Sequence, residues 1–328
     1  MEEALGSALL RDGATLVMSL LRTPAPEMAG VLGRFYVHKG ERWQYHIDAS
    51  LRRPMDALQT RFYLGRCGNE VITAVTTITC RGVGYVGHVF TEPAHRGRGA
   101  SSHLFRAMVE SERAQGARAL YLTTDYGTTP YRIYQRCGFT SRYPNSGEME
   151  WFATDEESFQ EEYFRAGACS ARPLRWEDWP LLNPLTARKD ERVVSYGLHD
   201  GFFRPRHFEY DFLTLKQGLE CFPGWEGRVL ESEHGSVVGL ATLIPRWDAD
   251  DVRVLDVLVH PRFVGEMARF VASLPRGGRR TIAYAAETEA ERIAALEGAG
   301  FRVVLRAPGR CHWTGAQPSA RLLLQRDE

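Results

Sequence analysis

Residues 89–101 read Val-Phe-Thr-Glu-Pro-Ala-His-Arg-Gly-Arg-Gly-Ala-Ser, and the fold can be predicted outward from them. It begins in an apolar strand and leads into a segment with apolar residues on one helical face, namely Leu104, Phe105, Met108 and Val109. A glycine-rich turn between a strand and a helix aims backbone N–H groups and the positive helix end at one point. The stretch therefore predicts a strand, a phosphate-binding turn and a helix.

The turn has the residues that a diphosphate needs. Gly97 and Gly99 allow positive φ and close approach of an anion, and Arg96 and Arg98 offer charge-assisted hydrogen bonds. A solvated hairpin is the alternative interpretation of the turn alone. It is not a P-loop, because no Gly-Lys-Ser/Thr follows, and it lacks the G-x-G-x-x-G spacing of a dinucleotide-binding fold.

The flanking sequence extends this unit in both directions. Turn residues and hydrophobic periodicity predict the order β-β-α-β-α-β, with elements at residues 71–79, 84–91, 100–115, 119–124, 130–137 and from 139 onward.

The same order recurs downstream. Gly235 begins a strand as Gly68 does, Pro261 follows a strand as Pro93 does, and Ala299-Gly-Phe301 echoes Cys137-Gly-Phe139. Chance similarity between two α/β segments is the alternative. We expect two tandem mixed α/β domains, each a twisted, mainly antiparallel sheet flanked by helices, with bounds of 1–160 and 168–328.

A resemblance to a known family follows from two motifs. Residues 89–101, with Ile133-Tyr-Gln-Arg-Cys-Gly-Phe139 further on, resemble the GNAT superfamily of acyl-CoA N-acyltransferases, and the match covers about residues 60–152. In that family an R-x-x-G-x-G/A loop cradles the CoA pyrophosphate, the preceding strand splays open to bond the pantetheine, and a tyrosine acts as general acid.

The resemblance implies roles for individual residues. Tyr134 matches the general acid, which protonates the departing thiolate. Ser101 stands where the family has Gly or Ala, and Gly127 where many members have Asn. The residues that match the acetyl-CoA site are Val89, Phe90, Thr91, Arg96, Gly97, Arg98, Gly99, Ala100, Ser101 and Ser102.

The sequence leaves the general base open. An ammonium acceptor must lose a proton before it can attack, and a carboxylate or imidazole can remove it directly or through water. Asp125, at a strand end, and His88, on the splayed strand, are the first candidates. Glu92, Glu148 and Glu150 are further candidates, although each of the five residues also fits a solvated or structural role. Regular alternation turns His88 and Glu92 away from the face of Val89 and Thr91.

The second repeat, in residues 168–328, keeps the predicted order of elements but lacks the residues that would bind CoA and donate a proton. Its loop, residues 262–267, has one glycine, and Glu266 places a carboxylate where a pyrophosphate would bind. Leu296 stands at the position of Tyr134. We expect a degenerate domain, with a second, unusual CoA site as the alternative.

Composition excludes several classes of protein. Lys and Arg number 41 and Asp and Glu number 41, so no net charge attracts the chain to nucleic acid or an anionic membrane. No apolar stretch reaches the length of a bilayer span, and we expect a cytoplasmic protein. The six cysteines have no zinc-ligand spacing, which predicts reduced core thiols and no metal.

The expected function is transfer of an acetyl or short acyl group from acetyl-CoA to an amine, with a small molecule as the preferred acceptor. A protein or peptide acceptor and a non-catalytic CoA-binding scaffold are the alternatives. The chain is expected to be a monomer or a homodimer. Residues 1–55, with Trp43, Tyr45 and His46, match no motif and are candidates to line the acceptor site.

Overall fold

The computed structural model describes residues 2–187, 208–246, 249–276, 280–307 and 320–327. The chain divides into two compact units. Unit 1 comprises Met1–Phe159 and Trp176–Asn183, and unit 2 comprises Gln160–Arg175 and Pro184–Glu328. Among the described residues, no helix is both long and apolar enough to span a membrane.

The described part of unit 1 is built on an eight-stranded sheet in the order β1-β2-β3-β4-β5-β6-β8-β7. All neighbouring strands are antiparallel except β5 and β6. The strands are β1 (Glu2–Leu9), β2 (Thr15–Arg22), β3 (Gln59–Cys67), β4 (Glu70–Cys80), β5 (Val83–Thr91), β6 (Ala119–Thr123), β7 (Thr140–Ser141) and β8 (Glu148–Phe152).

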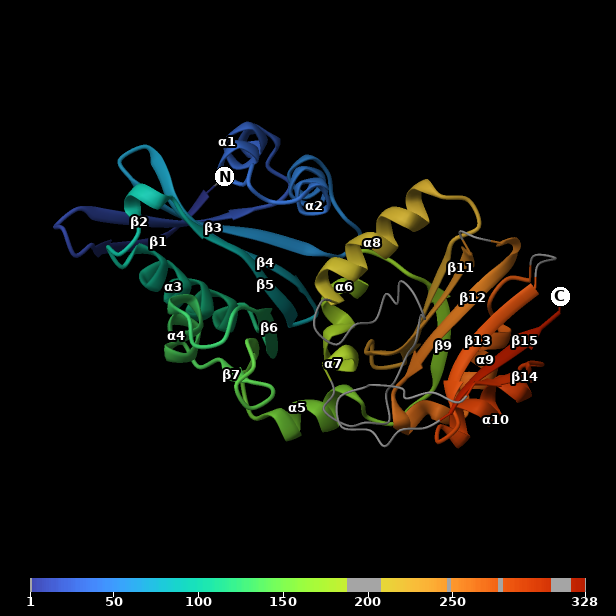
Figure 1. Ribbon diagram of the computed structural model, residues 1–328. Helices are drawn as coiled ribbons and strands as arrows, with labels where there is room; N and C mark the ends of the chain where they lie inside the picture. Colours follow the sequence, from blue (N-terminus) through green and yellow to red (C-terminus); the bar gives the residue numbers. More distant parts are fainter. Residues whose placement is uncertain (1, 188–207, 247–248, 277–279, 308–319, 328) are drawn as a thin grey trace. The chain divides into compact units, whose positions relative to one another are not determined.

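Helices cover both faces of this sheet. In Figure 1, α1 and α2 lie above it and α3 and α4 lie below it. The helices that begin and end within unit 1 are α1 (Ala29–Phe35), α2 (Glu41–Arg52), α3 (Ala100–Ala114), α4 (Thr129–Arg136) and α6 (Asp178–Leu181). The elements predicted around the glycine turn are thereby confirmed, with shifts of one or two residues at their ends.

Each face of the sheet has its own core. Apolar residues of α3 and α4, such as Leu104, Phe105 and Ile133, pack with Leu120 and Trp151 of the sheet. On the other face, residues of α1 and α2 pack against β3 and β4 in a second cluster, which includes Leu32, Phe35, Tyr36, Ile47, Leu51, Phe62 and Leu64. The two cores fix the sheet between two helical layers.

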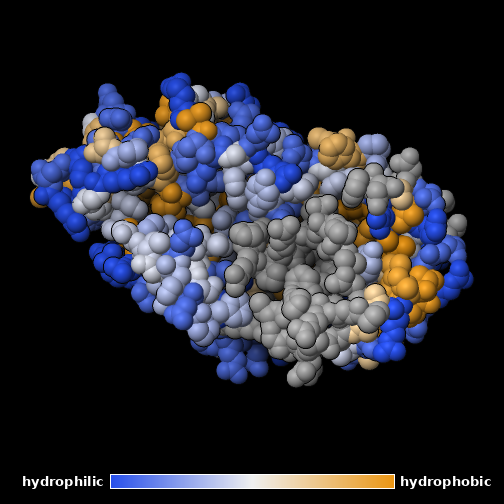
Figure 2. Space-filling model, in the orientation of Figure 1, coloured by the Kyte–Doolittle hydropathy of each residue, from blue (hydrophilic) through white to orange (hydrophobic). Residues whose placement is uncertain are grey.

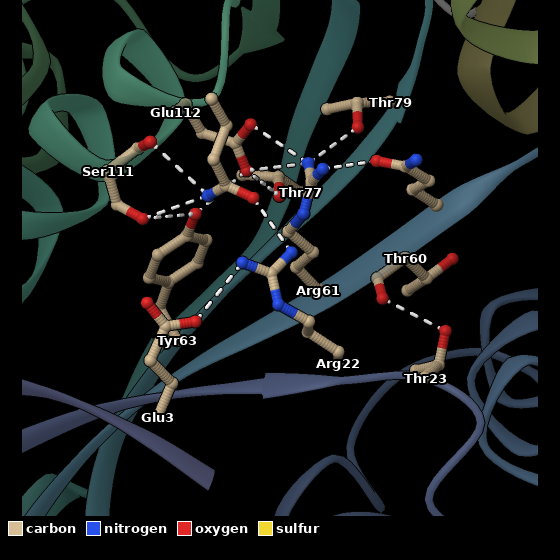
Figure 3. A network of polar contacts seen from close by, with 12 residues as sticks. Glu3, Arg22, Thr23, Thr60, Arg61, Tyr63, Thr77, Thr79, Ser111 and Glu112 are labelled. Carbon is tan, nitrogen blue, oxygen red and sulfur yellow. Dashed lines mark hydrogen bonds and ion pairs between the residues drawn. The ribbon is translucent and has the colours of Figure 1, made fainter. Parts of the chain in front are cut away.

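A buried polar network holds α3 on the sheet (Figure 3). The Arg61 guanidinium of β3 pairs with the Glu112 carboxylate of α3, and their side chains are only 8% and 2% exposed. Tyr63 and Thr77 donate hydrogen bonds to the same carboxylate, so its charge is satisfied inside the protein. The glycine turn precedes the N-terminus of α3, so that it leads into a helix whose C-terminal end is fixed on the sheet.

Strand β5 separates from β6 after the first third of its length. Parallel pairing joins Val83–Tyr85 to Ala119–Tyr121 and then ends. A bulge follows, where the register of β5 against β4 shifts and His88 adopts a φ of 52°. Because of the extra residue, Val86 and Val89 both pack on the core of α3 and α4, although they are three positions apart. The C-terminal half of β5 is therefore free to border a cavity.

Unit 2 has a sheet of the same kind. Its described strands follow the order β14-β15-β13-β12-β11-β10-β9, and only β12 and β13 are parallel. The strands are β9 (Cys169–Pro173), β10 (Glu226–Ser232), β11 (Val237–Arg246), β12 (Ala249–Val259), β13 (Arg280–Ala286), β14 (Arg302–Ala307) and β15 (Arg321–Arg326).

The other helices are α5 (Glu156–Tyr163), α7 (Asn183–Thr186), α8 (Phe208–Cys221), α9 (Met267–Ala272) and α10 (Ala290–Gly298). Both units are thus mixed α/β structures with a mainly antiparallel sheet flanked by helices, as the sequence predicted.

The expectation of core thiols is only partly right. Cys80 is buried, whereas Cys221 is exposed and Cys67, Cys137 and Cys169 are intermediate. These five are free thiols, and Cys311 lies outside the described residues.

Candidate active site

A cavity of about 590 Å³ lies in unit 1 where β5 separates from β6. Residues of the glycine turn, of the end of β5 and of α4 meet around it. The lining residues are Arg11, Val89, Phe90, Thr91, His95, Arg96, Gly97, Gly99, Ala100, Ser101, Ser102, Thr129, Pro130, Ile133, Tyr134 and Arg136. The structure therefore brings together Tyr134 and all but one of the residues predicted to bind acetyl-CoA.

The glycine turn presents its backbone N–H groups to this cavity. Gly97 and Gly99 have φ values of 78° and 94°, which side-chain-bearing residues rarely adopt, and Gly99 is the N-cap of α3. No described group accepts a hydrogen bond from the N–H of Gly97, Gly99, Ala100 or Ser101. Unpaired N–H groups at a helix N-terminus suit a phosphate ligand.

The two arginines of the turn differ in position. The Arg96 Nε donates to the Thr91 carbonyl oxygen at 3.0 Å, and its guanidinium lies over the Phe90 ring at 5.7 Å from the centroid. Arg96 thereby lines the cavity. Arg98 is the predicted residue that does not line it, because Asp12 and His95 hold its guanidinium.

The end of β5 borders the cavity through Val89, Phe90 and Thr91. The Thr73 hydroxyl, on β4, donates to the Phe90 carbonyl oxygen at 3.0 Å and lies 2.8 Å from the Thr91 hydroxyl. These contacts fix the separated part of β5 from the β4 side, while no described strand pairs with its β6 side after Tyr85.

Tyr134 lies on α4, and it forms part of the cavity wall. The ring packs on Phe105 with centroids 4.4 Å apart, and the residue is 5% exposed. No described residue hydrogen-bonds to its hydroxyl group. Burial raises the pKa of Tyr134 above its ordinary value of 10.0, so the phenol keeps its proton at neutral pH.

Neither of the first-ranked base candidates lines the cavity. Asp125 is exposed in the turn before α4, where its carbonyl oxygen accepts from the Thr128 hydroxyl at 2.7 Å. His88 is buried on the opposite side of β5 among aromatic rings, with Trp43 at 4.8 Å and Tyr36 at 5.6 Å between centroids. Burial holds the pKa of His88 well below 6.5, and its Nε2 has no partner among the described residues.

The remaining carboxylate candidates also lie away from the cavity lining. Glu148 and Glu150 are buried on β8, and Arg142 pairs with both at 3.2 and 3.5 Å. Glu92 is half-buried, and its N–H donates to the Ile72 carbonyl oxygen.

Trp43, Tyr45 and His46 belong to residues 1–55, which match no sequence motif. They lie on the side of β5 that carries His88. His46 packs edge-on against Trp179 at 4.8 Å, Trp43 lies 6.1 Å from Trp179, and Tyr45 lies 6.2 Å from Trp176. They therefore form an aromatic cluster with the segment Trp176–Asn183 of the same unit.

Sequence reasoning missed several residues of the cavity. Thr129, Pro130, Ile133 and Arg136 lie on α4 beside Tyr134, and their spacing along that helix could have indicated them. Arg11 comes from the turn between β1 and β2, for which the motif gave no signal.

Unit 2 lacks the corresponding groups among its described residues. Leu296 is fully buried on α10, and Glu266 forms an ion pair with Arg269 at 2.6 Å. The register between β11 and β12 is unbroken from Gly239–Val259 to Pro245–Arg253, so the bulge of β5 has no counterpart there. Within the described ranges, no group of three or more His, Cys, Asp or Glu side chains could hold a metal ion.

Comparison with known proteins adds the following. A search of curated proteins finds no match. The spermidine N-acetyltransferase of Vibrio cholerae, in a crystal structure with CoA and spermine, is 13% identical over 48% of this chain and 94% of that chain, with a TM-score of 0.35. The GNAT domain of S. lividans PAT is 19% identical over 45% of this chain and 96% of that chain, with a TM-score of 0.33.

One family model matches part of unit 1. Residues 59–141, which run from β3 to β7 and include the glycine turn and Tyr134, match the model for the Acetyltransferase (GNAT) domain. This part of the chain is therefore a GNAT acetyltransferase domain.

Proposed function

We propose that unit 1 transfers an acetyl or short acyl group from CoA to the amine of a small molecule. The observation that carries the proposal is the single cavity wall shared by the glycine turn, the free end of β5 and Tyr134. Arginines line this cavity, and no carboxylate is among its described lining residues, which favours an anionic ligand such as the CoA diphosphate.

The chemistry assigned to these residues is direct transfer. The neutral amine attacks the thioester carbonyl carbon, a C–N bond forms and the C–S bond breaks. Tyr134 gives its proton to the departing thiolate, the attacking amine loses its proton to solvent, and the Tyr134 phenolate takes a proton back from solvent before the next turnover. The N–H groups of the turn bind the diphosphate and thereby place the thioester at the far end of the cavity.

Residues 168–328, apart from the segment Trp176–Asn183, form a degenerate copy in this proposal. Leu296 has no proton to give, and Glu266 repels a phosphate. CoA is therefore expected to bind once per chain.

The test combines titration with turnover. Calorimetric titration of the full chain with CoA is expected to give one site. Acetyl-CoA is then offered with a panel of polyamines, amino acids, aminoglycosides and lysine-containing peptides, and the released thiol is measured. Release with small amines and not with peptides supports the proposal.

Three other results would contradict it. Release with peptides alone would assign a protein acceptor. CoA binding without release for any acceptor would favour a scaffold, and no CoA binding at all would show that CoA is not the acyl donor.

A further inference from the structure

The turn between β1 and β2 is rigidly built. Leu10 is 2% exposed and belongs to the core of α3 and α4, and its N–H donates to the Ala14 carbonyl oxygen at 2.8 Å. Asp12 Oδ1 accepts from the Ala14 N–H at 3.2 Å, and Gly13 takes a φ of 85°. The surface over this end of the hairpin is mainly hydrophilic (Figure 2).

This turn is bonded to the glycine turn, 86 positions further along the chain. The Arg11 N–H donates to the Arg98 carbonyl oxygen and Arg11 Nη1 to the Gly97 carbonyl oxygen, both at 3.1 Å. Asp12 Oδ2 forms an ion pair with Arg98 Nη2 at 2.5 Å. The hairpin therefore holds the glycine turn in place.

The two arginines at this junction differ in their position relative to the cavity. The Arg98 guanidinium contacts Asp12 and His95 and does not line the cavity. Arg11 lines the cavity, and its side chain makes one hydrogen bond to a described residue. Because a guanidinium has five N–H donors, most of those of Arg11 remain available to a ligand.

We propose that Arg11 binds a phosphate group of CoA, whereas Arg98 with Asp12 only fixes the glycine turn. This inference rests on the proposed function, since it names a residue of the same CoA site. The charge of Arg11 faces a cavity whose described lining includes no carboxylate and already contains Arg96 and the free N–H groups of the turn. The ligand is a phosphate of CoA, either in the diphosphate or at the 3′ position of the ribose.

The test measures the Kd of CoA for the full-length protein by calorimetry. Arg11→Gln is expected to weaken binding by about 10- to 100-fold, the range for a charge-assisted hydrogen bond. Arg11→Lys, which keeps the charge, should recover part of this loss. Arg22→Gln is the matched control, because Arg22 lies on the same hairpin, pairs with Glu3 and does not line the cavity.

Asp12→Asn separates contact with the ligand from support of the turn. It removes the ion pair to Arg98 and leaves Arg11 unchanged, so we expect a loss of less than about threefold. Equal losses in Arg11→Gln and Asp12→Asn would overturn the proposal, because the hairpin would then act only as a support. An unchanged Kd in Arg11→Gln would overturn it as well.

Dephospho-CoA identifies the phosphate. If Arg11 binds the 3′-phosphate, Arg11→Gln weakens CoA and leaves dephospho-CoA unchanged; if it binds the diphosphate, both ligands weaken alike. Either result supports the proposal. Failure of the wild-type protein to bind CoA would overturn the proposed function itself, whereas wild-type binding with no effect of Arg11→Gln overturns this inference alone.

Discussion

Arg61 Nη1 lies 3.0 Å from Glu112 Oε2 inside unit 1, and this ion pair joins β3 to the last turns of α3. The Tyr63 and Thr77 hydroxyls donate to Glu112 Oε1 at 2.8 and 2.5 Å. The Thr79 hydroxyl oxygen accepts from the Arg61 guanidinium at 2.7 Å. Because both charges are paired and hydrogen-bonded, removal of one partner would leave the other charge buried and unpaired and would strongly destabilise the folded protein.

Glu112→Gln is expected to destabilise unit 1 by about 3 kcal/mol, because it leaves the Arg61 charge buried and unpaired. Arg61→Met with Glu112→Gln should recover part of that loss, since the Gln oxygen still accepts from Tyr63 and Thr77 while no buried charge remains. Chemical denaturation measures both variants. A Glu112→Gln protein within about 0.5 kcal/mol of wild type would show that the pair is solvated.

Gly99→Ala is expected to weaken CoA binding, because a φ of 94° is strained for alanine and relaxation would turn the N–H groups at the start of α3. Gly68→Ala is the matched control. Gly68 has a φ of 58° in the turn between β3 and β4 and does not line the cavity. Both variants should lose about 1–2 kcal/mol of stability. Calorimetry should show a weaker CoA Kd for Gly99→Ala only, and equal Kd values would contradict this role of the turn.

Stability should fall as the pH drops below about 6.5. Burial lowers the pKa of His46 to about 3 and holds that of His88 well below 6.5, so both stay neutral in the folded protein. The unfolded chain binds protons at these sites first, and each site then removes up to about 1.4 kcal/mol per pH unit. Denaturant unfolding at pH 7, 6 and 5, followed by tryptophan fluorescence, measures the slope.

His46→Gln provides the comparison for this slope. Its amide can keep the hydrogen bond that links His46 Nε2 and the Thr60 hydroxyl, while one titrating group is lost. The variant is expected to be less stable at every pH, because it loses the packing on Trp179, but its slope should be shallower. An unchanged slope would show that His46 does not titrate on unfolding.

The glycine positions are the part of the fold that the sequence predicted best. Gly68 and Gly235 both take left-handed φ values, of 58° and 80°, before β4 and β11. Gly138 and Gly300 do the same, at 92° and 90°, after α4 and α10. Such turns depend on local sequence, so that a repeat of glycines predicts a repeat of elements.

Contacts between distant segments could not be predicted in this way. The Asp12-Gly13 dipeptide between two apolar stretches is a hairpin signal, but nothing local shows that the turn meets Gly97.

The segment Trp176–Asn183 follows a strand of unit 2 and yet belongs to unit 1. There, Trp176 N donates to Asp56 Oδ2 and Ala57 N donates to Glu177 Oε2. The bulge at His88 likewise depends on tertiary packing, although Gly87 beside it is a weak local signal.

In the proposed reaction Tyr134 protonates the thiolate of CoA, and the Tyr134→Phe variant tests this role. The substitution keeps the ring that packs on Phe105 and removes only the hydroxyl group. Tyr131→Phe is the matched control, because Tyr131 lies on the same helix, its hydroxyl is within 2.8 Å of the Ser141 Oγ, and it does not line the cavity.

The measurement is steady-state turnover with acetyl-CoA and an amine that the wild-type protein acetylates. We expect kcat to fall by about 10²-fold or more in Tyr134→Phe with little change in the KM for acetyl-CoA, because the proton is needed only in the transition state. Tyr131→Phe should keep its kcat within about twofold. A Tyr134→Phe protein with full kcat would rule out this role of Tyr134, since another group or water would then supply the proton.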